Sequence, residues 1–225
     1  MTLLRQAVAV AAKDLRVEIR GRRTFGAAAP FAATMLLSFG LALGPGRSLL
    51  QAAAPGLLWL AVLFASVVAF GQSYRAEADD DALEGFVLGR IDDAAVFLGK
   101  AAAVWIELLV LEVVVVVLAV ALFDLPPGGS PLAIAAALVL GTVGLAAVGS
   151  LFGVVAESPR AGTGILPLLI LPLATPVLLA GVQTTELSLL GSPGRAGPWL
   201  ALLVAFDVAF LATGTLVFGH LLEER

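Results

Sequence analysis

The chain contains six apolar runs that are each long enough to cross a lipid bilayer as a helix. Such a helix needs about 20 mostly apolar residues to match the hydrocarbon layer. With 60% hydrophobic and 13% charged residues, the chain also has too little polar surface to cover a water-soluble globule. We therefore expect a single all-α integral membrane domain over residues 1–225, with six transmembrane helices. Their expected ranges are 24–44, 53–74, 99–123, 131–155, 162–182 and 198–221.

Glycine and proline clusters mark the ends of these runs, because both residues interrupt helices. The clusters are "GPGRS" at 44–48, "DLPPGGS" at 124–130, "ESPR" at 157–160 and "GSPGRAG" at 191–197. Within the fifth run, Pro167, Pro172 and Pro176 each remove a backbone hydrogen bond, so its boundaries are the hardest to place. Residues 183–197 are expected to form the longest outer loop, either plain or with a short helix that dips into the membrane.

Lysine and arginine are unequally distributed between alternate loops. Cytoplasmic loops of membrane proteins carry an excess of these residues. If the N-terminus is cytoplasmic, 11 of the 13 basic residues lie inside and only Arg47 and Arg195 lie outside. We therefore expect both termini and the segment 75–98 to face the cytoplasm. The inside set is Arg5, Lys13, Arg16, Arg20, Arg22, Arg23, Arg75, Arg90, Lys100, Arg160 and Arg225.

Residues 1–23 are expected to form an amphipathic helix on the inner membrane surface, because apolar residues recur there at spacings of three and four. The apolar face is Leu4, Val8, Ala11, Leu15 and Ile19, and the basic flanks are Lys13, Arg16, Arg20 and Arg22. The apolar stretch before Lys13 is only about six residues, which is shorter than a secretory signal requires. A frayed basic tail is the alternative.

A polar segment, residues 75–98, separates the second run from the third. Acids cluster where a helix would begin, which suits the positive end of its dipole, and apolar residues follow at helical spacing. We expect one short cytoplasmic helix from Asp79 to Leu88, and a second that is capped by Asp92 and Asp93 and continues into the third span. The acids are Asp79, Asp80, Asp81 and Glu84, and the apolar residues are Leu83, Phe86, Val87 and Leu88. This apolar ridge either docks into a groove on another protein or rests on lipid headgroups.

The residues needed for catalysis are missing from the sequence. The only Gly-Lys pair, Gly99-Lys100, lacks the upstream glycine of a phosphate-binding loop. No cysteine and a single histidine leave no metal cluster and no nucleophile–base set. The net charge is −4, and the lysines and arginines are distributed among alternate loops rather than gathered in one patch. Both features argue against a nucleic-acid partner. We therefore predict no catalytic or metal site, and any ATP-driven work would require a separate subunit.

Three carboxyl side chains fall well inside the apolar runs: Glu107 and Glu112 in the third, and Asp207 in the sixth. At this depth a carboxyl group must face protein or water, be paired, or be protonated. Glu107 and Glu112 are about 140° apart around a helix, so they are not expected to form one site. They would either form hydrogen bonds between spans or to a partner, or line an interface for translocation or transfer.

The fourth run carries a strip of small residues with a Gly-xxx-Gly spacing, which allows close approach of another helix. The strip is Thr142, Ala146, Gly149 and Gly153. It would serve either a contact within the chain or a contact between subunits.

Four stretches, in order along nearly the whole chain, resemble one family of transport proteins. They are "KDLRVEIRGR" at 13–22, "PGLLWLAVLFASVVAFGQSY" at 55–74, "GTVGLAAVGSLFG" at 141–153 and "GILPLLILPLATPVLLAG" at 164–181. They are similar to the CcmB family, the haem-exporter permeases of cytochrome c maturation, within the ABC-2-type permeases. The segment 75–98 resembles the loop of ABC-2 permeases that docks on the ATPase subunit. It departs from the pattern at Asp81-Ala82, where the family often has Asp-Gly, and at Gly89-Arg90, where many relatives have Ser-Pro or Thr-Pro.

The resemblance implies a permease subunit in the bacterial inner membrane. Its implied partners are an ATPase (CcmA-like), a haem-binding membrane subunit (CcmC-like), a small membrane subunit (CcmD-like) and a periplasmic haem chaperone (CcmE-like). ATP hydrolysis on the partner would move residues 79–88, and this movement would promote export of haem or release of the haem-loaded chaperone. Because six spans are half the usual number in such transporters, a second copy or another membrane subunit should complete the assembly.

Haem is expected as a transported or transferred ligand of the complex rather than as a cofactor bound stably by this chain. The available axial ligands are limited to His220, Met1, Met35 and Tyr74. A generic ABC-2 permease for a lipid, drug or polysaccharide remains an alternative. A membrane scaffold that transports nothing is another.

Overall fold

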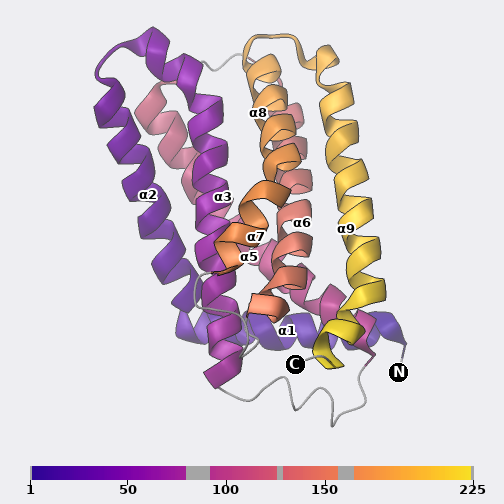
Figure 1. The fold of residues 1–225 in the computed structure, drawn as a ribbon. Coiled ribbons are helices and arrows are strands. Elements are labelled where there is room, and N and C mark those ends of the chain that lie inside the picture. Colours follow the sequence, from indigo (N-terminus) through magenta and orange to yellow (C-terminus); the bar gives the residue numbers. More distant parts are fainter. Residues whose placement is uncertain (1, 80–91, 126–128, 157–164, 224–225) are drawn as a thin grey trace.

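All regular secondary structure in the described part of the chain is helical, as expected. A computed structural model describes residues 2–79, 92–125, 129–156 and 165–223. The helices are α1 (Leu3–Gly21), α2 (Arg23–Leu43), α3 (Arg47–Asp79), α5 (Asp93–Phe123), α6 (Pro131–Ala156), α7 (Ile165–Leu173), α8 (Thr175–Leu189) and α9 (Gly197–Glu223), with one 3-10 turn, η1 (Pro193–Arg195). In Figure 1, α2, α3, α6, α8 and α9 run lengthwise and α5 crosses behind them, while α1 lies across the end where both termini are found.

Five of these helices are long and apolar enough to cross a membrane. Their spans are Thr24–Leu43, Arg47–Gln72, Asp93–Phe123, Pro131–Val154 and Gly197–Leu221. Leu166–Leu173 and Thr175–Leu189 pass the same test as a pair, with a bend of 49° between them. Counted as one bent span, this pair gives the six crossings that the sequence predicts, so the chain is a multi-pass membrane protein.

The bend in the fifth span lies beside prolines that were expected to remove backbone hydrogen bonds from its helix. Ala174 separates α7 from α8, with Pro172 before it and Pro176 after it. The chain still donates hydrogen bonds across the break, from Ala174 N to Ile170 O (2.8 Å) and from Leu178 N to Ala174 O (2.9 Å). The prolines therefore bend this span without unwinding it.

Of the two alternatives for residues 183–197, the plain loop is wrong for the first half. The chain is helical there, but as the continuation of α8 to Leu189 rather than as a separate short helix. The helix ends in a Schellman motif: Gly191 adopts a φ of 72°, Gly191 N donates to Ser188 O (3.3 Å), and Ser192 N donates to Leu187 O (2.8 Å). Thr184, Thr185 and Ser188 are buried on the inner face of these extra turns. What remains of the loop is short and holds η1.

Trp59 of α3 is fully buried at the centre of the main core cluster. Its Nε1 donates to Thr185 Oγ1 at 3.0 Å, which explains why the polar turns of α8 are buried. Two glycines make room for its ring. A Cβ added at Gly141 of α6 would lie 2.5 Å from Trp59 Cη2, and one added at Gly181 of α8 would overlap the indole more severely.

The predicted N-terminal helix is present as α1, and it packs on the start of α5. A Cβ at Gly99 would lie 2.6 Å from both the Ala7 carbonyl oxygen and Val10 Cβ, so this crossing requires glycine. Beside it, buried Lys100 approaches Asp14, with Nζ 3.8 Å from Oδ2. The apolar face predicted for this helix divides in two. Ala11 is buried with Ala7 and Val10 against the bundle, whereas Leu4, Val8 and Ile19 remain exposed on the outside.

The second helix expected within the segment 75–98 is confirmed as the beginning of α5. Asp92 is its N-cap and accepts a hydrogen bond from Ala94 N at 2.9 Å. The first turns pack on α9: the Phe97 and Phe218 rings lie 5.5 Å apart, and Gly214 makes room for Phe97. The expected cytoplasmic helix from Asp79 to Leu88 lies outside the described residues, apart from Asp79, whose backbone forms the last position of α3.

The small-residue strip of α6 is buried along its whole length. A Cβ at Gly149 would overlap the Phe70 ring of α3. Thr142 turns its hydroxyl to its own helix and donates to Leu138 O at 2.8 Å. At Gly149, therefore, the close approach that the strip allows is made within the chain.

Candidate functional site

The three intramembrane carboxyl groups lie in three different surroundings. Glu112 is 3% exposed and Asp207 5% exposed, while Glu107 is partly exposed at a cavity. Within the described part of the chain, Glu107 Oε2, Glu112 Oε1 and both Asp207 oxygens are buried without a hydrogen-bond partner. Buried polar groups of proteins are nearly always paired, so these atoms are the least satisfied part of the isolated chain.

Asp207 sits directly over a glycine of the neighbouring helix. A Cβ at Gly144 of α6 would lie 2.7 Å from Asp207 Oδ1 and 2.8 Å from Phe206 Cδ1. The carboxyl group therefore occupies space that a side chain on α6 would otherwise fill. Neither Asp207 nor Glu112 lines the cavity that Glu107 lines, so the three carboxyl groups do not share that site.

Glu107 lines a cavity of about 470 Å³ at the junction of α1, α2, α3 and α5. This volume is within the range of about 300–1,000 Å³ that is usual for small-molecule sites. The wall is mostly apolar, and only four of its residues are polar or charged: Glu18, Arg22, Thr24 and Glu107. The apolar ones are Leu15, Ile19, Phe25, Ala28, Ala69, Ile106, Leu108, Val110 and Leu111.

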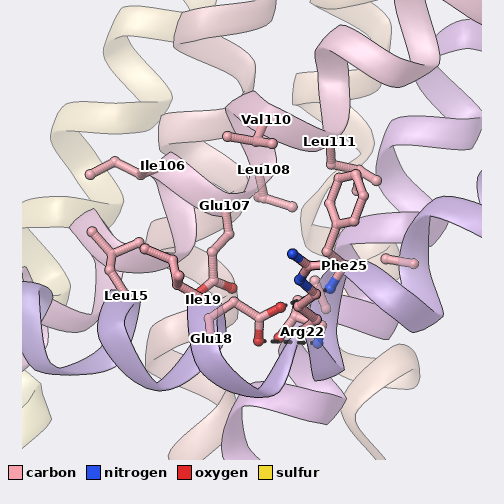
Figure 2. Close-up of a pocket in the computed structure, with 13 residues that line it drawn as sticks. Leu15, Glu18, Ile19, Arg22, Phe25, Ile106, Glu107, Leu108, Val110 and Leu111 are labelled. Carbon is pink, nitrogen blue, oxygen red and sulfur yellow. Dashed lines mark hydrogen bonds between the residues drawn. The ribbon is translucent and has the colours of Figure 1, made fainter.

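The polar corner of the cavity is built by the sharp turn from α1 to α2. Arg22 has a φ of 49°, and this left-handed residue turns the chain so that Glu18 reaches the start of α2. The Glu18 carboxylate accepts hydrogen bonds from Thr24 N (3.1 Å) and Phe25 N (3.0 Å), two donors that a helix N-terminus leaves unpaired. In Figure 2, Glu107 points from α5 toward Glu18, and the Arg22 side chain stands beside Phe25.

Sequence reasoning singled out Glu107 but missed the cavity and the roles of Glu18 and Arg22. Their roles depend on the left-handed turn at Arg22. Arginine does not favour this conformation, so the sequence does not indicate the turn. The predicted coupling residues, Asp79 to Leu88, lie outside the described residues apart from the backbone of Asp79, so the structure does not bring them to this site or to any other. In the described ranges, no group of three His, Cys, Asp or Glu residues could hold a metal ion.

These features define a multi-pass α-helical membrane protein whose spans rest on an amphipathic helix at one end of the bundle. Comparison with known proteins places it more narrowly. The chain belongs to the CcmB protein family, whose model matches residues 5–224.

Three similar proteins each bear the name "Heme exporter protein B". That of Pseudomonas aeruginosa is 34% identical over 176 residues, which cover 78% of each chain. That of Bradyrhizobium diazoefficiens is 29% identical over 206 residues, or 90% of each chain. That of Rhodobacter capsulatus is 30% identical over 175 residues, which cover 78% of this chain and 80% of the relative. The family resemblance found in the sequence is therefore confirmed.

Substitution of Glu112 by methionine is expected to stabilise the isolated chain. Methionine has nearly the same shape and removes the unpartnered Oε1, so the free energy of unfolding should rise by about 1 kcal/mol or more. Thermal unfolding in detergent micelles measures the change. The control is Glu186→Met on exposed Glu186 of α8, which should change stability by less than about 0.5 kcal/mol. A loss of stability in Glu112→Met would mean that the carboxyl group is satisfied within the folded chain, for instance by water.

Proposed function

We propose that this chain is the membrane permease subunit of an ABC complex that exports haem, or delivers it to a periplasmic chaperone, for c-type cytochrome biogenesis. The observation that carries the proposal is the match to proteins named "Heme exporter protein B" over 78–90% of the chain, together with the family match over residues 5–224. The unequal distribution of basic residues supports a bacterial inner-membrane protein with both termini in the cytoplasm.

In this proposal the energy comes from ATP hydrolysis on a separate, CcmA-like subunit. The sequence lacks the glycine-rich loop and lysine that hold nucleotide phosphates. The coupling segment, Asp79 to Leu88, would receive the movement of that subunit, with Leu83, Phe86 and Val87 as its apolar contact. A haem-binding CcmC-like subunit and a CcmD-like subunit would join the chain, and either a second copy of the chain or another membrane subunit would complete the membrane part.

The packing around the beginning of α5 suggests how movement would spread. Helix α5 runs without a break from Asp93 to Phe123, so a push on its first turn reaches the opposite end of the bundle. Its first turns are tied to α1 through Gly99 and to α9 through Phe97. A shift of the cytoplasmic segment would therefore move α1, α5 and α9 together, because packed cores move as rigid units rather than deforming continuously.

Affinity purification of the chain from its native membrane tests this function. We expect an ABC ATPase and a haem-binding membrane protein to co-purify in fixed ratios, with haem absorption in the purified complex. A matched purification of an unrelated multi-pass protein from the same membrane controls for adventitious partners. An ATPase without haem absorption would instead identify a permease for another substrate, and the absence of any ATPase would favour a scaffold.

A further inference from the structure

The cavity between α1, α2 and α5 lies where an amphiphile of the membrane would meet the protein. Helix α1 carries its basic residues on one side and its exposed apolar residues Leu4, Val8 and Ile19 on another. This arrangement is typical of amphipathic helices that lie at the boundary of lipid headgroups and acyl chains. Ile19 forms part of the cavity wall. The cavity is therefore placed at that boundary, with apolar walls on the bilayer side.

An apolar track leads from the cavity along the outside of α5. Ile106 and Val110 line the cavity and are 39% and 53% exposed. Val113, Val117 and Val120 continue the row at spacings of three and four, and all three are exposed. Residues at this spacing lie on one side of a helix, so an acyl chain that leaves the cavity finds a continuous apolar surface.

The polar corner offers both signs of charge. Arg22 supplies a guanidinium group, which suits a phosphate, and takes part in none of the ion pairs found among the described residues. Opposite it, Glu18 and Glu107 present carboxyl groups, and Glu107 Oε2 has no hydrogen-bond donor among the described residues. A buried acceptor of this kind is costly unless a ligand supplies the missing donor.

We propose that this cavity binds a membrane phospholipid whose headgroup carries a primary amine, with phosphatidylethanolamine as the probe of this class. Its phosphate would lie at Arg22, its ammonium group would donate to Glu107 and Glu18, and one acyl chain would follow Ile106 and Val110. Haem fits less well. Its propionates would meet two carboxyl groups, and none of the described lining residues is a His, Met, Cys or Tyr that could ligate iron.

The test is native mass spectrometry of the purified full-length chain, titrated with phosphatidylethanolamine, phosphatidylcholine and phosphatidylglycerol that have the same acyl chains. Phosphatidylethanolamine should bind most tightly, because the choline headgroup keeps the charge but cannot donate a hydrogen bond, and the glycerol headgroup has no positive charge. Glu107→Gln and Arg22→Gln should each weaken its binding about tenfold, the size expected for one charge-assisted hydrogen bond. Ile106→Trp, which places a bulky ring on the cavity wall, should abolish it.

Matched controls separate binding from folding. Glu112→Gln on α5, Arg16→Gln on α1 and Val208→Trp on the exposed side of α9 introduce the same new side chains outside the cavity lining and outside the α5 track, and should bind the lipid like the unmodified chain. Unfolding temperatures of all six variants identify any that misfold. The proposal is overturned if phosphatidylglycerol binds as tightly as phosphatidylethanolamine, if the three cavity variants bind like their controls, or if equimolar haem displaces the lipid. None of these outcomes depends on an ATPase or on transport, so the proposed function can fail or stand separately.

Discussion

Replacement of Gly181 by alanine is expected to destabilise the folded chain, although alanine is the better helix former. The added methyl group would overlap the indole of Trp59, which is also in close contact with Gly141 and is held by the hydrogen bond to Thr185. The ring cannot move away without losing that bond and disturbing α6. Overpacking of a well-packed core costs about 1–3 kcal/mol, and thermal unfolding in detergent measures the loss.

The sign of the effect distinguishes steric overlap from helix propensity. Gly71 of α3 has no neighbouring atom within 4 Å of an added Cβ, so Gly71→Ala should stabilise the chain by about 0.5–1 kcal/mol. In the double variant Trp59→Leu/Gly181→Ala, the smaller side chain removes the overlap. The two substitutions should therefore cost less together than the sum of their separate effects. If Gly181→Ala and Gly71→Ala both stabilise the chain, the packing described around Trp59 is wrong.

Most of the fold could be predicted because its main signals are local. Apolar length alone locates the spans, since a bilayer imposes nearly the same requirement on every crossing helix. Asp92 was predicted as a cap from its residue type and position, and it is the N-cap of α5, which begins at Asp93. The end of α8 also had a local signal in the cluster at 191–197, although the fifth run was predicted to end at residue 182. Gly191 followed by Pro193 marks a helix end, so the fifth span could have been extended to Leu189.

The features that were not predicted depend on contacts between distant residues. Trp59 needs space at Gly141 and Gly181 and a partner at Thr185, up to 126 positions away, and no pattern within one run indicates this combination. The cavity likewise requires a corner at Arg22 and the crossing of α1 over α5. Periodicity identified one apolar face on α1, but only tertiary packing determines which part of it meets the bundle and which part meets lipid.

Substitution of Phe86 by aspartate is expected to abolish co-purification of the ATPase. Phe86 lies outside the described residues, and the prediction follows from the sequence, where it forms a short apolar ridge with Leu83 and Val87 beside Asp79, Asp80, Asp81 and Glu84. An aromatic side chain that is a hot spot at the centre of an interface contributes about 2 kcal/mol or more, and a buried, unpaired carboxylate would add a further penalty. Together these effects correspond to at least about a 100-fold loss of affinity.

The measurement compares the ATPase recovered per mole of tagged chain, and the control keeps the ridge apolar. Phe86→Leu should retain most of the ATPase, because leucine preserves an apolar contact of similar size. The amount of each variant in the membrane shows whether insertion is normal. If the ridge merely rests on lipid headgroups, Phe86→Asp and Phe86→Leu will recover equal amounts of ATPase. Loss in the aspartate variant alone would identify this ridge as the contact through which a separate motor moves α5.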